Sequence, residues 1–182
     1  VGITDDFNLA EQNGYIARST DYGVTWELIS NNMFGGRFNI LDTSCSGTGQ
    51  YVAALGPVVS FPACVNQYST DFGQTWIISN FQGNVDANNS MRQSFDGQYV
   101  VGGTSQSLPH VSSDYGNTYT QVNGVQGISL SISNTGQFIF MERSTQGGNI
   151  DYLSSDFGAS WNALTRPTTP PFINGPVFLI DT

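Results

Sequence analysis

Short apolar runs rich in β-favouring residues alternate with turn residues along most of the chain, and no stretch keeps a helical period. Such runs predict β-strands. Three of them follow a turn that reads Gly-Gln-aromatic, at residues 49–51, 97–99 and 136–138. We therefore expect a strand, the Gly-Gln turn, and a second strand beginning near Tyr51, Tyr99 and Phe138. The pattern predicts an all-β protein with almost no helix.

An octapeptide with the pattern S-[ST]-D-[YF]-G-x-[TS]-[WY] occurs four times, beginning at residues 19, 69, 112 and 154. Recurrence about every 40–50 residues predicts a propeller or another repeat array. The aspartate and serine can accept hydrogen bonds from N–H groups of their own turn, and the glycine suits a positive φ. The residues assigned to this structural turn are Ser19, Asp21, Gly23, Trp26, Ser69, Asp71, Gly73, Trp76, Ser112, Asp114, Gly116, Tyr119, Ser154, Asp156, Gly158 and Trp161.

The octapeptide resembles the Asp-box, also called the bacterial neuraminidase repeat. Its third copy ends in Tyr119 instead of Trp, and its fourth has Ser160 instead of Thr, which are small departures. The resemblance implies a β-propeller of four four-stranded antiparallel blades, with the octapeptide as the turn between the third and fourth strands. We expect one domain, residues 1–182, whose blades are about 1–30 with 176–182, then 31–80, 81–122 and 123–165.

The two ends of the chain predict how the blades join. Residues 1–4 stand as far before the first octapeptide as residues 51–54 stand before the second, so they are expected to be the second strand of blade one. Residues 177–181 resemble residues 38–42, a predicted first strand. The C-terminal strand is therefore expected to join the first blade and close the ring. A fragment cut in phase from a larger propeller is the alternative.

The net charge limits the classes of molecule that the protein is expected to bind. Acidic residues number 14 and basic residues five, all of them arginine, which gives a net charge of −9. A protein this acidic does not suit nucleic acid or an anionic membrane surface, and no apolar run is long enough to span a bilayer. His110 is the only histidine, so no multi-histidine metal site is predicted. No cofactor motif is present in the sequence either, and no metal or cofactor is expected.

The two cysteines fall in the predicted second blade. Cys45 follows its first strand and Cys64 precedes its third. A disulfide between them is consistent with an extracellular protein, or with one on the surface of a cell or virus particle. Two separate thiols are the alternative.

Two functions follow from the fold expectation. The first is a non-enzymatic binding or structural module whose loops contact a glycan or a protein surface, with assembly with other chains as a further reading. The second is a sialidase-like glycoside hydrolase or a fragment of one, because sialidases carry Asp-boxes and hold a substrate carboxylate with arginines. The resemblance offers no confident catalytic assignment. Possible ligand-binding residues are Asp5, Asp6, Arg37, Arg92, Glu142 and Arg143.

Overall fold

The computed structural model describes residues 2–4, 15–29, 40–57, 63–84, 89–104, 107–125, 127, 129–143 and 150–164. Within these ranges every regular element is a strand, which confirms the predicted all-β class. The described residues contain no helix that is long and apolar enough to cross a membrane. The strands are β1 (Gly2–Thr4), β2 (Tyr15–Arg18), β3 (Glu27–Ile29), β4 (Asp42–Cys45), β5 (Val52–Pro57), β6 (Ala63–Ser69), β7 (Ile77–Ile78), β8 (Gly83–Asn84), β9 (Asn89–Gln93), β10 (Val100–Thr104), β11 (Ser107–Ser112), β12 (Thr120–Gln121), β13 (Ser129–Ile132), β14 (Ile139–Arg143), β15 (Ile150–Ser154) and β16 (Asn162–Leu164).

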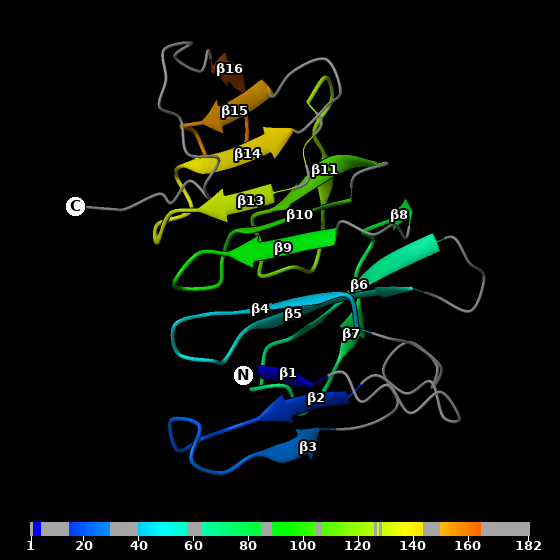
Figure 1. Cartoon of the computed structure of the whole chain (residues 1–182), viewed down its shortest axis with the longest axis vertical. Coiled ribbons are helices and arrows are strands. Elements are labelled where there is room, and N and C mark those ends of the chain that lie inside the picture. Colours follow the sequence, from blue (N-terminus) through cyan, green and yellow to red (C-terminus); the bar gives the residue numbers. More distant parts are fainter. Residues whose placement is uncertain are drawn as a thin grey trace, which may run out of the picture.

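The strands form four antiparallel sheets, which we call blades one to four in chain order (Figure 1). Blade one is β1-β2-β3, blade two β4-β5-β6-β7, blade three β9-β10-β11-β12 and blade four β13-β14-β15-β16. The short strand β8 pairs with β6 and so extends blade two beyond residue 80, where blade three was expected to begin. In each blade the octapeptide connects the last two strands, as the sequence predicted.

The blades lie in an open row rather than in the closed ring that was expected. Figure 1 shows blade one at one end of the row and blade four at the other. Blades two, three and four meet through their first strands, since β4 contacts β9 and β9 contacts β13. The strand that was expected to close the ring, at residues 177–181, lies outside the described residues.

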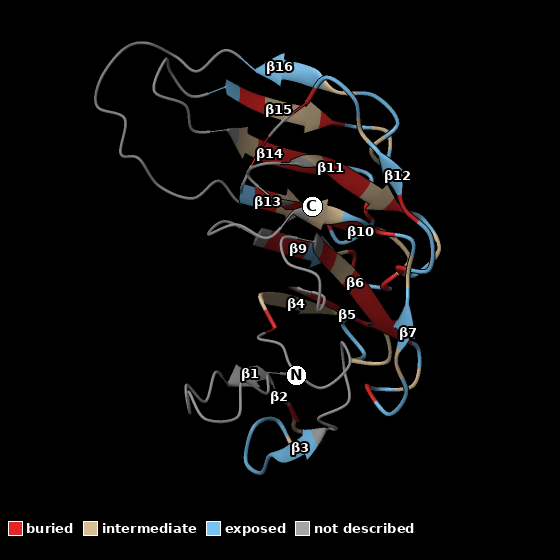
Figure 2. Ribbon diagram, turned by 90° about the vertical axis from the view of Figure 1, so that its right-hand side faces the viewer, coloured by how far each residue is buried: buried red, intermediate tan, exposed pale blue. Residues whose placement is uncertain are grey.

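Buried apolar side chains fill the spaces between successive blades. Central strands are buried on both faces, while the outer strands β7, β12 and β16 are exposed (Figure 2). This explains why residues 52–55 form an unbroken apolar run, because a strand between two neighbours needs apolar side chains on both faces. The three clusters are Ile16, Ile40 and Ala54; then Ala53, Leu55, Cys64, Phe81, Met91, Val100 and Tyr119; then Val101, Val125, Leu130, Ile139 and Met141.

The disulfide considered for blade two is not formed. Cys45 pairs with Val52 at one end of β5, and Cys64 pairs with Pro57 at the other. Strands rise about 3.3 Å per residue, so these ends lie far beyond the span of a disulfide. The two cysteines are far apart because β4 and β6 flank β5 on opposite sides. The end of β4, with Cys45, lies beside the start of β5, whereas the start of β6, with Cys64, lies beside the end of β5.

Candidate functional site

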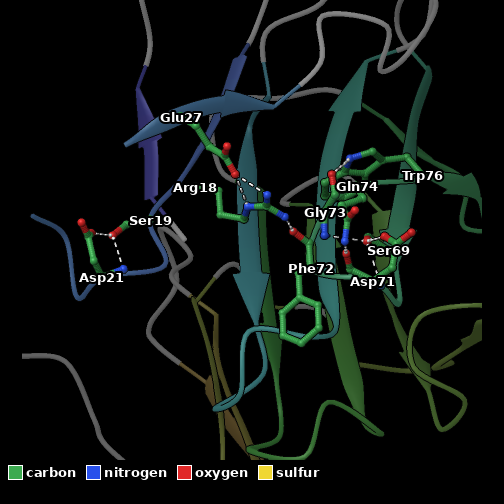
Figure 3. Close-up of polar contacts among 10 residues, drawn as sticks. All are labelled: Arg18, Ser19, Asp21, Glu27, Ser69, Asp71, Phe72, Gly73, Gln74 and Trp76. Carbon is green, nitrogen blue, oxygen red and sulfur yellow. Dashed lines mark hydrogen bonds and ion pairs between the residues drawn. The ribbon is translucent and has the colours of Figure 1, made fainter. Parts of the chain in front are cut away.

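The octapeptide folds into a closed set of hydrogen bonds, seen clearly in blade two (Figure 3). The Asp71 carboxylate accepts a bond from Ser69 Oγ at 2.8 Å, from the Thr75 N–H at 2.8 Å and from Thr75 Oγ1 at 2.6 Å. Ser69 Oγ in turn accepts the Gly73 N–H at 2.8 Å. The Trp76 indole N–H donates to the Gly73 carbonyl at 2.9 Å, which folds the ring back over the turn. The side chains of Ser69, Asp71, Thr75 and Trp76 thus all form hydrogen bonds within the turn.

The other three copies repeat the bonds of the serine and the aspartate, and the indole bond recurs at Trp26 and Trp161 but not at Tyr119. Oδ1 of Asp21, Asp114 and Asp156 lies 2.8 Å from the N–H of the residue four positions later in each case. The glycines have positive φ as predicted, from 81° at Gly73 to 87° at Gly23. The aromatic residue before each glycine also has positive φ, between 58° and 63°, which the sequence analysis did not foresee. These aromatics are Tyr22, Phe72, Tyr115 and Phe157.

The unforeseen conformation lets the octapeptide join neighbouring blades. The Tyr115 N–H bonds to the carbonyl of Gln98 in its own blade at 3.0 Å. The Tyr115 ring points to the preceding blade and stacks on Tyr51 at a centroid distance of 4.2 Å. Phe157 stacks in the same way on Tyr99 at 4.7 Å. The two motifs recognised separately in the sequence, Gly-Gln-aromatic and the octapeptide, therefore form one junction between blades.

A different contact joins blades one and two. Arg18 and Glu27 face each other across β2 and β3, and Arg18 Nε lies 2.6 Å from Glu27 Oε1 (Figure 3). Arg18 Nη1 also donates to the Phe72 carbonyl in the octapeptide of blade two, at 2.9 Å. Sequence reasoning missed this arginine, although it directly precedes Ser19 of the first octapeptide.

The residues considered for a sialidase-like site are not brought together in the described structure. Arg92 forms an ion pair with Asp42 of blade two at 2.8 Å, so it ties blades two and three together. Glu142 lies opposite Asp151 across β14 and β15, and Arg143 ends β14 in blade four. Asp5, Asp6 and Arg37 lie outside the described residues. No group of three or more metal-ligating side chains gathers anywhere in the described ranges.

A groove with a volume of about 940 Å³ lies between blades three and four. One wall is the outer strand of blade three with the turn after it, residues 120–125. The other wall is the fourth octapeptide, together with Tyr152 and Ala163 of β15 and β16. We call this the outer groove. Sequence reasoning did not predict this groove, because its walls belong to two different repeats.

The lining of the outer groove mixes aromatic rings with uncharged polar groups. Tyr152 and Trp161 are half-buried and Phe157 is exposed, while Gln121 and Asn123 present amide side chains. No arginine or lysine is among the residues that line it. Its carboxylate, Asp156, is held by Ser160 and Ser154 within the octapeptide, and the bonds from Ser160 lower its pKa. The groove is therefore suited to an uncharged or cationic ligand rather than an anion.

Comparison with known families identifies the repeat. The family model described as BNR/Asp-box repeat matches residues 67–76.

Residues 67–76 are an Asp-box repeat.

The other three copies share its sequence pattern and the bond from a backbone N–H to the aspartate, so we call all four octapeptides Asp-boxes. No protein in the curated set matches the chain.

Several solved structures share the fold. A structure titled YCF48 bound to D1 peptide is 16% identical with a TM-score of 0.57, covering 86% of this chain and 48% of that one. TolB from Acinetobacter baumannii is 15% identical with a TM-score of 0.59, covering 90% and 39%. The GH74 xyloglucanase from Xanthomonas campestris is 12% identical with a TM-score of 0.53, covering 87% and 28%. The chain thus spans less than half the length of each. At these identities the likeness establishes a β-propeller type of fold.

The hydrogen bonds of the Asp-boxes lower the pKa of their carboxyl groups. Bonds from Thr25, and then from Ser19, lower the pKa of Asp21 from 3.8 to about 2. Burial raises the pKa of Asp71 and Asp114, but the bonds from Thr75 and Thr118 outweigh it, so both pKa values are lowered. All four aspartates are thus held in their ionised form.

We expect the protein to lose stability as the pH falls from about 4 to 2. Because the pKa of Asp21 is lower in the folded than in the unfolded chain, its stabilisation is complete above its ordinary value of 3.8 and is lost as the pH falls through about 2. Urea unfolding followed at a series of pH values measures this directly. The Asp21→Asn variant is the control, and its stability should depend less on pH across that window. An equal dependence in both proteins would contradict the assignment.

Proposed function

We propose that the chain is a non-enzymatic binding module that holds an extended peptide segment in the outer groove. The observation that carries the proposal is the position of two sheet edges beside this groove. β12 ends the sheet of blade three and β16 ends that of blade four. Residues of both strands line the groove.

Sheet edges favour an extended peptide as the ligand. The outer side of β12 has no further strand in the sheet order, so the backbone N–H and C=O groups on that side do not pair with β11 and face away from the blade. A peptide added along such an edge gains main-chain hydrogen bonds, and pockets beside the edge select its side chains. Trp161 and Phe157 supply apolar surface there, while Gln121 can bond to the peptide backbone.

Charge supports an uncharged or basic segment. The chain carries a net charge of −9, and no cationic side chain lines the groove. An acidic peptide would meet repulsion, whereas a basic one would be attracted on approach. A protein of similar fold was solved with a peptide bound, which agrees with a binding role for this kind of fold. The binding role is preferred over hydrolysis because Arg92, one of the arginines considered for a substrate clamp, is engaged by Asp42.

The double variant Gln121→Ala/Asn123→Ala should bind peptide about 10- to 100-fold more weakly, since each lost hydrogen bond is worth roughly 0.5–1.5 kcal/mol. Both side chains are exposed, so the fold should be retained. The assay incubates the purified chain with an array of 12-residue peptides of neutral and basic composition. The best binders are then titrated against both proteins.

Gln74→Ala is the matched control, because Gln74 is an exposed amide that lies outside the groove and donates to the carbonyl of Asp71 in its own turn. Its affinity should equal that of the unmodified chain. A neutral oligosaccharide array is run in parallel, with released sugar measured. Binding of oligosaccharides but not peptides, or peptide binding that the double variant does not weaken, would overturn the proposal.

A further inference from the structure

The junction between blades repeats the same contacts wherever two complete copies of both motifs meet. Blade two presents Tyr51 and blade three covers it with Tyr115; blade three presents Tyr99 and blade four covers it with Phe157. The planes of the paired rings differ by only 27° and 29°. In both cases the ring of the Gly-Gln-aromatic turn belongs to the earlier blade, and the Asp-box ring to the later one. The junction therefore has a direction along the row.

Backbone contacts repeat with the rings and in the same direction. The Gly47 N–H of blade two donates to the Phe95 carbonyl of blade three at 2.7 Å. The Phe95 N–H donates to the Asn134 carbonyl of blade four at 2.8 Å. Each blade thus offers donors and a ring toward the next blade, and acceptors and an Asp-box ring toward the one before.

The two end blades carry the unmatched halves of this junction. Phe138 is the ring of the Gly-Gln-aromatic turn in blade four, and it is 36% exposed. Tyr22 is the Asp-box ring of blade one, and its side chain is fully exposed. Neither ring stacks on another among the described residues, whereas their counterparts in the middle of the row do. The two halves are complementary. Phe138 of blade four is the Gly-Gln-aromatic ring, which the earlier blade of a junction supplies, and Tyr22 of blade one is the Asp-box ring, which the later blade supplies.

We propose that a second copy of this chain continues the row, with Phe138 of one copy stacked on Tyr22 of the other. The two rings lie on blades at opposite ends of the row, so blade four of one copy must meet blade one of another (Figure 1). The contact is head-to-tail. Such contacts give a closed ring when a whole number of the rotations that relate successive copies makes a full turn. Two copies related by a two-fold axis give eight blades, within the four to eight typical of propellers.

The interface continues the junction already present between blades of one chain. It buries apolar rings that are otherwise in water, which favours association. The net charge of −9 on each copy opposes it. Added salt screens that repulsion and should strengthen the pairing.

Cross-linking with introduced cysteines tests the proposal. Chains carrying Tyr22→Cys and Phe138→Cys are mixed, oxidised under mild conditions and separated by denaturing electrophoresis. A disulfide-linked dimer is expected in the mixture, in several-fold excess over either variant alone. Ile78→Cys mixed with Phe138→Cys is the control, because Ile78 is 63% exposed on the outer strand β7, away from the end faces. Cys45 is changed to Ser throughout.

A chain that carries both introduced cysteines distinguishes pairing of Tyr22 and Phe138 between two copies from pairing within one chain. An intramolecular disulfide that forms equally at all dilutions would show that one chain closes on itself, and this would overturn the proposal. A mixture that gives no more dimer than the Ile78→Cys control would overturn it too. Sedimentation equilibrium provides the second measurement: Tyr22→Ala should weaken dimerisation about tenfold, and an unchanged association constant would contradict the contact.

Discussion

Gly136→Ala should destabilise the protein by roughly 2–5 kcal/mol, through backbone strain and a steric clash together. Gly136 has φ +80°, a conformation that an alanine adopts only at a cost. A Cβ on Gly136 would also lie 2.5 Å from the ring of Tyr99 in the preceding blade. Tyr99 is the ring on which Phe157 stacks, so the clash falls in the junction between blades three and four.

Gly49→Ala separates the two causes. Gly49 occupies the same position in blade two with φ +76°, but a Cβ there would meet no atom within 4 Å. Only the strain of a left-handed alanine remains, roughly 1–2 kcal/mol. Urea unfolding of both variants measures the difference. Equal losses would show that the close approach between blades contributes nothing to stability.

Asp114→Ala should destabilise the protein by about 2–4 kcal/mol, because its carboxylate holds the third Asp-box together. Asp114 accepts bonds from Ser112 Oγ at 2.8 Å, from the Thr118 N–H at 2.8 Å and from Thr118 Oγ1 at 2.7 Å. Removing it leaves these donors without their acceptor at the point where Tyr115 reaches blade two. The stability of Asp114→Asn should lie between those of the unmodified protein and Asp114→Ala, since an amide retains one acceptor oxygen. Urea unfolding at pH 7 provides the comparison.

Asp96→Thr is the control for that experiment. Asp96 lies in the turn before β10, where it accepts the Gln98 N–H at 3.0 Å. Thr48 holds the corresponding position in blade two and accepts the Gln50 N–H at 3.3 Å. The substitution should change stability by less than about 0.5 kcal/mol. An Asp114→Ala loss no larger than this would mean that the Asp-box carboxylate is dispensable.

The internal bonds of the Asp-box explain why serine, aspartate and glycine recur in it. Here its aromatic residue, held at positive φ, has a second role. It leaves the hairpin and covers a ring of the neighbouring blade, at Tyr115 and at Phe157. Stacked aromatic pairs of this kind add roughly 0.5–1.5 kcal/mol beyond the apolar area that they bury.

Tyr119 illustrates how the neighbours decide the fate of an Asp-box residue. It occupies the position of Trp26, Trp76 and Trp161, yet its side chain is buried against Phe81 in an edge-to-face contact. Burial raises the pKa of its hydroxyl. In the sequence, Tyr119 is only a small departure from the repeat pattern. The packing between blades two and three makes it a core residue.

Local features of the fold followed from the sequence alone. The spacing of the octapeptides, the Gly-Gln turns and the short apolar runs predicted an all-β repeat protein with a turn between the last strands of each blade. The glycines at Gly73 and Gly158 were assigned positive φ because no other residue adopts that conformation so readily. All these features depend on residues close together in the chain, where residue type and hydrogen bonding decide the conformation.

Contacts between blades were decided only by the tertiary structure. They include the stacking of Tyr115 on Tyr51, the bond from Arg18 to the Phe72 carbonyl, the ion pair of Arg92 with Asp42, and the outer groove. The open row and the separation of Cys45 from Cys64 belong with them. Each joins residues that lie on different strands or blades. Their distances depend on how sheets pack and twist against one another, and the residue types at a single repeat do not specify that packing.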